Sequence, residues 1–471
     1  MLKKQETISY VEDFWDSKII PALTEYIAIP NKSPAFDPDW EANGYMEDAL
    51  QLALDWLDKN KPTGATITVK RENGRTPLLL VNVPGTQPGR ILMYGHLDKQ
   101  PEMEGWRDNL GPWKPVIEDD KLYGRGGADD GYALFASVCA LNALQEQGID
   151  HPNVVILVEF SEESGSPDLP FHIDNSVDEI GSPDLIVCLD SNSGNYDQFW
   201  CTTSLRGMIP INMKVEVLRE GVHSGDASGI VPSSFRVARQ LLNRLEDVDS
   251  GEVLPDFLQV DIPNIRVEQA KKASEVLGDE VFEMFPFLDG MKPASDVNFE
   301  NVLNRTWRAT VSVVAQDGMP AVKDGGNVLR PYTTLKLSLR LPPGLDGEIA
   351  MKKVCDLLTK NPPYGARVTL ETAEPATGWH APITPEWFDN LMEDASQTYF
   401  GKSAMYMGTG GTIPFMAMLG EKFPAANFVI TGVLGPASNA HGPNEFLHIP
   451  YAKTLTSSIC HILANFNNAK G

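Results

Sequence analysis

Several side chains of this chain have types and spacings that suit a divalent metal ion. His96 and Asp98 stand two positions apart in RILMYGHLDKQP, so on a strand both would point to the same face. A histidine just past an apolar strand, with a carboxylate beside it, suits a metal ligand and the acid that orients it. The HxD pattern is short, and alone it indicates a metal site only weakly.

Two pairs of acidic residues have ordinary structural interpretations when each is taken alone. Asp129 and Asp130 in LYGRGGADDGYALF precede an Ala- and Leu-rich segment. Taken alone, they are best explained as the N-cap and a first-turn acid of a helix, a role worth about 1 kcal/mol. The pattern is also compatible with Asp129 giving a carboxylate to a metal. Glu162 and Glu163 follow the apolar run NVVILVEF, and adjacent glutamates usually form a solvated surface pair.

Asp190 and His441 are also unremarkable one at a time. Asp190 ends LIVCLD before a turn-rich segment, and His441 lies in the loop ASNAHGPNE. Taken together, however, His96, Glu162, Glu163 and Asp190 all follow apolar strands at their carboxyl ends. In an open α/β sheet those ends share one edge, where ligands bind.

The donor types and their charges favour a dinuclear site. Imidazoles and carboxylates without cysteine suit hard-to-borderline divalent metals. Two such ions would be balanced by one bridging hydroxide and three carboxylates, with one histidine per ion and Asp129 shared; the carboxylates are those of Asp129, Glu163 and Asp190. Two metals about 3.5–4 Å apart polarise a carbonyl and generate hydroxide near neutral pH. Glu162, left uncoordinated, would take the proton of the water and pass it to a leaving amine.

The elements that must position these residues form two domains. Residues 132–147 are helix-like and end at Gly148, which is typical of a helix C-terminus. Apolar runs lie before and after this segment and predict an α/β domain on a largely parallel sheet; the runs are 77–83, 90–94, 153–160, 185–189 and 427–433. Residues 334–341 (TLKLSLRL) alternate strictly, as an antiparallel strand with one covered face does.

Further alternating and helix-like segments complete a βαββαβ, ferredoxin-like order; they are residues 211–217, 232–245, 307–313, 347–360 and 367–372. An acidic, proline-containing stretch at about 246–305 interrupts it. We therefore expect an α/β catalytic domain of residues 1–206 and 382–471, with an α+β domain of residues 207–381 inserted in it.

Composition narrows the possible partners. The 471 residues suggest about three domains, or two with insertions. The formal net charge of −25 repels phosphate backbones, so nucleic acid is not an expected partner. The same field attracts metal ions, although solubility alone explains such a charge in many proteins. Five cysteines without a CxxC motif, no apolar secretory segment and no apolar run near ~20 residues favour a cytoplasmic protein without membrane attachment.

The motifs, taken in order, resemble those of the M20 metallopeptidase family, which includes carnosinase-like and Cys-Gly dipeptidases, aminoacylases and desuccinylases. The resemblance covers most of the chain. No single motif identifies the family, but the complete set in this order is specific to it. The motifs are GHLD at 95–98, LYGRGGADD at 122–130, SEESGS at 161–166, LDS at 189–191, VHSG at 222–225 and AHGPNE at 440–445.

This resemblance implies roles for individual residues. It implies five metal ligands, with Asp129 bridging, often through a cis peptide to Asp130; the five are His96, Asp129, Glu163, Asp190 and His441. It also implies Glu162 as the general base and Asp98 as the acid that orients His96. The fold it implies is a dinuclear-metal, aminopeptidase-like catalytic domain carrying an inserted lid and dimerisation domain.

Three residues of the inserted domain gain a role only from the resemblance. His223 would otherwise be a turn histidine, and Arg340 a solvated arginine on the polar face of its strand. The resemblance implies that His223 reaches the site of the partner subunit and stabilises the oxyanion. It implies that Arg340 binds the C-terminal carboxylate of the substrate, which suits a guanidinium fork, and that Asn327 supports the same pocket.

The segments TLKLSLRLPP and MGTGGTIPF are most similar to those of carnosinase-like dipeptidases, with two departures. Gly131–Tyr132 stands where that group usually has Lys-Gly, and Gly408–Thr409 where it usually has Arg-Glu. The second departure removes two charges near the expected substrate side. It leaves the peptide preference open while the metal chemistry is unaffected.

We therefore expect a cytoplasmic exopeptidase that cleaves dipeptides or short peptides with a free C-terminal carboxylate. It would use two zinc ions per subunit, with manganese or cobalt also compatible, and act as a homodimer. An N-acyl amino-acid amidohydrolase with the same metals is the close alternative. A catalytically silent binding or dimerisation protein on this fold is a third, which the complete ligand set and Glu162 argue against.

Overall fold

The computed structural model describes residues 1–470, apart from the side chain of Pro414. The chain divides into two compact units. Unit 1 comprises Met1–Thr202, Ala381–Met407 and Met418–Gly471, and unit 2 comprises Thr203–His380 and Gly408–Ala417. The sequence boundaries expected near 206 and 382 lie close to these divisions, but the segment Gly408–Ala417 belongs to unit 2 by its contacts, and the sequence did not indicate this.

Unit 1 is built on a six-stranded sheet of order β1-β2-β6-β3-β7-β17. Strands β6, β3, β7 and β17 run parallel to one another, whereas β2 pairs antiparallel with β6, and β1 pairs antiparallel with β2 at the edge of the sheet. Their bounds are β1 (Thr66–Lys70), β2 (Leu78–Val83), β3 (Gln87–His96), β6 (Pro152–Glu159), β7 (Leu185–Cys188) and β17 (Asn427–Ile430). Strands β2, β6, β7 and β17 and the second half of β3 are almost entirely buried, which is why they appear as continuous apolar runs in the sequence, whereas β1 has no buried residue.

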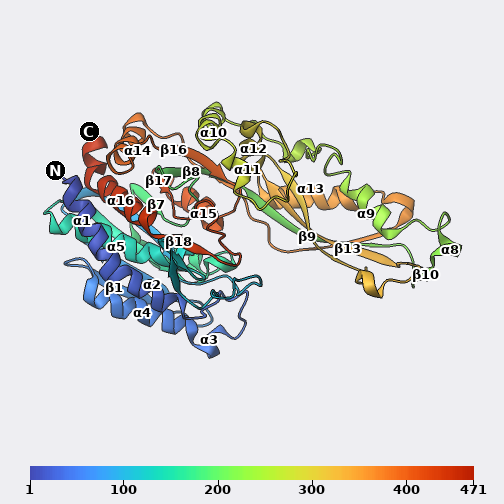
Figure 1. Ribbon diagram of the computed structural model, residues 1–471, viewed down its shortest axis with the longest axis horizontal. Helices are drawn as coiled ribbons and strands as arrows, with labels where there is room; N and C mark the ends of the chain where they lie inside the picture. Colours follow the sequence, from blue (N-terminus) through green and yellow to red (C-terminus); the bar gives the residue numbers. More distant parts are fainter. Residues whose placement is uncertain (471) are drawn as a thin grey trace. The chain divides into compact units, whose positions relative to one another are not determined.

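Helices cover this sheet and share its core. Helix α5 packs on β3 and on the C-terminal helix α16, and α16 also contacts α1 and α14 (Figure 1). The helices of unit 1 are α1 (Lys4–Phe14), α2 (Ile20–Ile27), α3 (Trp40–Asn43), α4 (Tyr45–Asn60), α5 (Tyr132–Glu146), α6 (Leu169–Asp174), α7 (Val177–Ile180), α14 (Glu386–Tyr399), α15 (Pro414–Lys422) and α16 (Ile449–Lys470), with α15 beginning in the segment assigned to unit 2. The Ala-rich face of α5 allows the helix to lie close to both neighbours, since nearly all of its side chains are buried.

A small antiparallel sheet of order β18-β5-β4 joins distant parts of unit 1. Its strands are β4 (Val116–Glu118), β5 (Lys121–Tyr123) and β18 (Phe446–His448). Because β5 pairs with β18, the glycine-rich turn after β5 and the loop before β18 are brought together.

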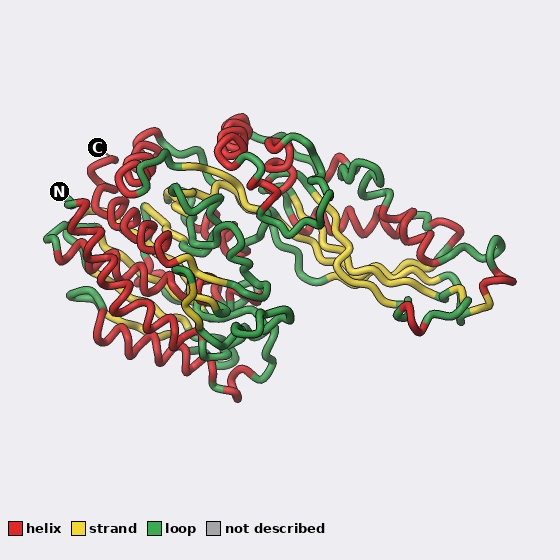
Figure 2. The backbone as a smooth tube through the Cα atoms, in the orientation of Figure 1, coloured by secondary structure: helices red, strands yellow, loops and turns green. Residues whose placement is uncertain are grey.

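Unit 2 contains an antiparallel sheet of order β11-β13-β9-β14, with α9 and α13 packed on one face (Figure 2). The elements are β9 (Gly207–Glu216), α9 (Ser234–Leu242), β11 (Thr310–Asp317), β13 (Tyr332–Leu341), α13 (Gly347–Thr359) and β14 (Arg367–Thr372). Along the chain this is the expected βαββαβ order. The alternating side chains of β13 divide as the sequence predicted, since Leu335, Leu337 and Leu339 are buried under the helices and Lys336 is exposed.

The predicted interruption of unit 2 contains three helices, α10 (Asn264–Leu277), α11 (Glu280–Glu283) and α12 (Asn298–Thr306). The remaining elements are β8 (Trp200–Leu205), β10 (Val222–His223), α8 (Ser224–Ala227), β12 (Val328–Leu329), β15 (Trp379–His380) and β16 (Met405–Thr409). Among residues 1–470, no helix is both long and apolar enough to cross a bilayer.

Candidate metal centre

The carboxyl ends of β3, β6 and β7 place three predicted site segments at one edge of the sheet. His96 is the last residue of β3 and pairs with Glu159 at the end of β6. Glu162 and Glu163 follow within a single helical turn, and Asp190 lies two residues beyond β7. The parallel ladder therefore fixes these side chains relative to one another, as the pattern of apolar runs predicted.

Asp129 reaches the same edge from the glycine-rich turn between β5 and α5. Its backbone is not helical (φ −122°, ψ 90°), and the peptide bond to Asp130 is cis. The N-cap of α5 is Gly131, and no side chain caps it. Asp129 therefore does not cap the helix, contrary to the alternative interpretation. The carboxylate of Asp129 has other partners.

His441 comes from the loop between β17 and β18. Its backbone has a positive φ of 64°, a conformation that side chains with a Cβ rarely adopt. Its Nε2 lies 2.9 Å from Oδ2 of Asp129 and 3.3 Å from Oε2 of Glu163. The loop histidine thus joins residues more than 270 positions away in the chain.

The five side chains expected as ligands form two groups that share Asp129. The first group is His96, Asp129 and Asp190, and the second is Asp129, Glu163 and His441. Nε2 of His96 lies 3.4 Å from Oδ1 of Asp129 and 3.8 Å from Oδ2 of Asp190. Oδ1 of Asp129 faces one group and Oδ2 faces the other, so one oxygen of this carboxylate is available to each group.

Burial makes the carboxylates of the centre costly to ionise without a cation. Burial raises the pKa of Glu163 to about 8 and that of Asp190 to about 7, with the negative charge of Asp129 adding to both. The two histidines act in the opposite sense on Asp129: burial alone would raise its pKa, but hydrogen bonds from His441 and His96 hold it below its usual range. A divalent ion beside these carboxylates would supply positive charge and favour their ionised forms.

The donor atoms fit a divalent metal. Both ring nitrogens of His96 are buried, and neither makes a well-formed hydrogen bond with any residue among 1–470. Burial alone would lower the pKa of His96, but the carboxylates of Asp129 and Asp98 outweigh it and raise the pKa well above its ordinary value. The carboxylates around the buried His96 ring therefore favour a positive charge at this position. Imidazole nitrogens together with carboxylate oxygens are ligands that zinc, manganese and cobalt accept.

Asp98 and Glu162 lie beside the two groups and belong to neither. Asp98 accepts hydrogen bonds from the backbone N–H groups of Glu162 (3.1 Å) and Glu163 (3.0 Å), and its Oδ1 lies 3.3 Å from Nδ1 of His96. The Glu162 side chain is 11% exposed, with Oε2 4.0 Å from Nε2 of His96. Burial, with the charge of Asp190 next, raises the pKa of Glu162 well above its ordinary value. The interpretation of Glu162 and Glu163 as a solvated surface pair does not hold.

The model of the peptidase family M20/M25/M40 matches residues 92–465. The chain belongs to this peptidase family. It is therefore a hydrolase of the M20 metallopeptidase type, as the ordered motifs predicted, and a family of metallopeptidases implies divalent metal binding. Within the family it falls in the carnosinase-like and Cys-Gly dipeptidase group.

Curated relatives and solved structures agree with this assignment. The M20 chain is 27% identical over 380 residues to a cysteinylglycine-S-conjugate dipeptidase of Corynebacterium striatum, covering 77% of this chain and 79% of the relative. It is 24% identical over 446 residues to the human Beta-Ala-His dipeptidase, covering 88% and 84%. Two solved structures, human carnosine dipeptidase 1 and a di-peptidase of Saccharomyces cerevisiae, each match 99% of both chains with a TM-score of 0.78, at 22% and 20% identity, and share its fold.

The three expected substrate-binding residues of this M20 peptidase all lie in unit 2. The His223 side chain is 66% exposed, with Nδ1 3.5 Å from Oδ2 of Asp226. Arg340 lies on the polar face of β13, where its Nη1 donates to Oγ1 of Thr412 (3.1 Å). Asn327 is exposed, and its carbonyl accepts from the Ser224 N–H group (2.9 Å).

Three residues around the centre received no role from the sequence. Gln100 donates from Nε2 to Oε2 of Glu163 (2.6 Å), and Arg125 forms a buried ion pair with Glu445. All three stand inside or beside the motifs GHLD, LYGRGGADD and AHGPNE. The position of these residues in or beside the motifs was the only sequence signal for a role at the centre. Their hydrogen-bond and ion-pair partners follow from the fold, which brings the three segments together.

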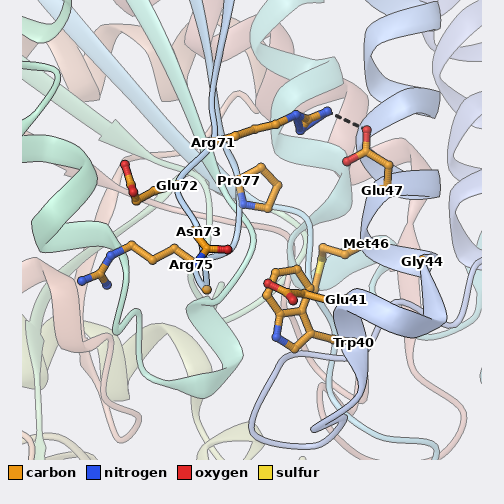
Figure 3. A pocket seen from close by; sticks show the side chains of 11 residues that line it. Trp40, Glu41, Gly44, Met46, Glu47, Arg71, Glu72, Asn73, Arg75 and Pro77 are labelled. Carbon is orange, nitrogen blue, oxygen red and sulfur yellow. Dashed lines mark hydrogen bonds and ion pairs between the residues drawn. The ribbon is translucent and has the colours of Figure 1, made fainter.

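A separate pocket of unit 1, of about 490 Å³, is lined by the start of α4 and the segment after β1 (Figure 3). Trp40, Met46 and Pro77 supply apolar walls, and Nη2 of Arg71 lies 2.6 Å from Oε1 of Glu47 across the opening. None of the predicted site residues lines this pocket.

Proposed function

We propose that this M20 peptidase hydrolyses dipeptides or short peptides that end in a free carboxylate, with two divalent metal ions per subunit. The observation that carries the proposal is the pair of ligand groups sharing the two oxygens of Asp129. The dipeptidase names of its relatives support a small peptide as the substrate.

The ligands divide between the two ions. His96 and Asp190 would hold one ion, Glu163 and His441 the other, and Asp129 both. Zinc is the first choice for this mixture of imidazole and carboxylate, and manganese and cobalt fit the same donors. When bound, a pair of divalent ions polarises an amide carbonyl and lowers the pKa of a water molecule.

Two neighbouring acids complete the chemistry. The Glu162 side chain is only 11% exposed and lies outside both ligand groups, so its carboxylate is free to take a proton from the attacking water and to pass it to the leaving amine. Burial raises the pKa of Glu162 above its ordinary value, which makes its ionised carboxylate a stronger proton acceptor. Oδ1 of Asp98 lies 3.3 Å from Nδ1 of His96, a position from which it would orient the ring and leave Nε2 to the metal.

Unit 2 would supply substrate binding and dimer contacts. Arg340 has no carboxylate partner among the residues the structure describes, which supports its role in binding the substrate carboxylate, with Asn327 lining the same pocket. The exposed His223 would act in the active site of the partner subunit. Strand β11 supports dimerisation through this unit, because it is an edge strand with Val313 and Val314 exposed.

An N-acyl amino-acid amidohydrolase is the second candidate. It is favoured by Gly408–Thr409, which lacks the acidic residue that carnosinase-like dipeptidases usually have there. Such a loss would weaken selection for a substrate with a free amino group.

All five cysteines are unpaired, which supports a reducing compartment such as the cytoplasm for either activity.

A substrate screen separates the two activities. Free dipeptides and N-acylated amino acids with the same C-terminal residue are supplied to the enzyme loaded separately with zinc or manganese. We expect the larger kcat/KM for the free dipeptide. A larger value for the acyl-blocked compound would establish the amidohydrolase instead, and no turnover of either class with either metal would refute both.

A further inference from the structure

A buried ion pair joins the two segments that bring Asp129 and His441 into the centre. Arg125 lies in the glycine-rich turn and Glu445 in the loop before β18, 320 residues further along. Their side chains are 1% and 0% exposed. A buried charge that loses its partner is strongly unfavourable, so these two segments are held to each other.

The pair also makes contacts with the backbone on both sides. Nη2 of Arg125 donates to the carbonyl oxygens of His441 (3.0 Å) and Gly442 (2.8 Å). Oε1 of Glu445 accepts from the N–H group of Gly126 (2.9 Å), three residues before Asp129. Arg125 thus holds the backbone of one ligand, and Glu445 holds the turn that carries another.

Gly126 shows how closely the turn is packed at this point. Its φ is +80°, and a Cβ there would lie 2.7 Å from carbon atoms of the buried Lys99 side chain. The Lys99 Nζ in turn donates to the carbonyl oxygens of Tyr26 (2.6 Å) and Ile29 (2.7 Å). The turn is therefore fixed from the side of α2, while Glu445 ties it to the loop of His441.

The two ligand groups depend on this network to different degrees. His96 and Asp190 project from the ends of β3 and β7, which the parallel ladder holds in register. His441 lies in a loop and has a positive φ itself, and Arg125 donates a hydrogen bond directly to its carbonyl oxygen. Loss of the ion pair should therefore move His441 while it leaves the ends of the strands in place.

We propose that Arg125 and Glu445 are positioning residues that set the affinity of the group Asp129, Glu163 and His441 for its metal ion. They affect the group His96, Asp129 and Asp190 less, because that group shares only Asp129 with the network. The proposal rests on the proposed dinuclear function. It makes the occupancy of the two groups separable by substitutions that remove no ligand.

The test is the metal stoichiometry and the stepwise zinc affinities of Glu445→Gln and Arg125→Lys, measured by equilibrium dialysis and elemental analysis. Glu445→Gln removes the charge with little change in shape, and Arg125→Lys keeps the charge but loses the fork that reaches His441 and Gly442. We expect the zinc affinity that His441→Ala abolishes or weakens to fall about 10–100-fold in these two variants, the range known for residues that support metal ligands. The affinity for the other zinc should change clearly less.

His441→Ala serves as a reference for an enzyme lacking that ligand, and Glu47→Gln as the control for the loss of an ordinary surface ion pair. Circular dichroism checks folding, and if one variant fails to fold the other decides. Two zinc ions with unchanged affinities in a folded variant would overturn the positioning role. Equal weakening of both ions would also overturn it. A wild-type enzyme that binds fewer than two ions would instead refute the proposed function.

Discussion

At the scale of single residues, the proposed metal ligands and the proposed general base occupy different positions in the centre. The five expected ligands divide between two groups, whereas Glu162 lies within 4.0 Å of His96 and belongs to neither. A carboxylate that is buried beside ligands without being one of them is suited to proton transfer. Glu162 and Glu163 are adjacent in the chain, so their assignment to different roles can be tested directly.

Glu162→Gln should keep both metal ions and lose most of the activity. Glutamine fills the same space but cannot accept the proton of the water, and general-base catalysis contributes roughly 10²–10⁴-fold to such reactions. We expect kcat/KM to fall by about that factor while zinc content stays at the wild-type level. Glu163→Gln is the matched comparison and should lose metal as well. Full activity of Glu162→Gln would show that another group is the base.

Removal of the metal should make stability depend on pH through the same carboxyl groups. In the folded apo-enzyme the pKa of Glu163 is raised to about 8 and that of Asp190 to about 7, whereas in the unfolded chain both titrate near 4. These groups keep their protons on folding and release them on unfolding, so the free energy of unfolding falls as the pH rises from about 4 to about 8.

Thermal unfolding with and without a chelator checks this sign. The stability of the chelated enzyme should fall between about pH 6 and pH 8. Added zinc should increase the stability most at the higher pH, where the carboxylates are ionised. Glu163→Gln should show a weaker pH dependence in the apo state, because its amide cannot titrate. An apo-enzyme that becomes more stable over this range would contradict the assigned direction.

At the scale of secondary structure, register decides which side chains face the core. The strand β13 alternates along its length, with Leu337 fully buried and Lys336 exposed. Leu337→Ala should lower the free energy of unfolding by about 2–5 kcal/mol, because it leaves a cavity under α9 and α13. Lys336→Ala, its neighbour on the opposite face, should change it by about 0.5 kcal/mol or less.

Urea denaturation of the two variants measures the difference. Similar values for the two substitutions would mean that β13 is not held in this register. A large loss in Lys336→Ala would place that side chain in a core, contrary to its exposure.

Regular elements and their order were accessible from the sequence, because strands buried on both faces and strands covered on one face leave different patterns. The continuous runs gave β2, β3, β6 and β7, and the alternation gave β13. The position of β17 beside β7, parallel to it, also agrees with the expectation that residues 427–433 rejoin the sheet.

Contacts between distant segments were not accessible in the same way. The ion pair of Arg125 and Glu445 and the hydrogen bond from Gln100 to Glu163 depend on loops that local pattern does not place. The non-helical backbone of Asp129 was equally hidden, because two acids before an Ala-rich helix read as an ordinary helix start. The resemblance to a family supplied the ligand roles that periodicity alone left open.

At the scale of the whole molecule, the proposal requires two chains for one active site. His223 is exposed in unit 2, and its role in the partner's site predicts that two inactive variants complement each other. His223→Ala leaves Glu162 intact, and Glu162→Gln leaves His223 intact. In a mixed dimer, one active site then receives both functional residues and the other receives neither.

Each variant alone should therefore be a dimer with low activity, as size-exclusion chromatography and a dipeptide assay would show. After the two are mixed under conditions that allow subunits to exchange, half of the dimers are mixed and one site in each is complete, so activity should rise to about a quarter of the wild-type value. Mixing His223→Ala with itself controls for the exchange treatment. If His223 acted within its own subunit, every site would lack one residue, and mixing would restore no activity.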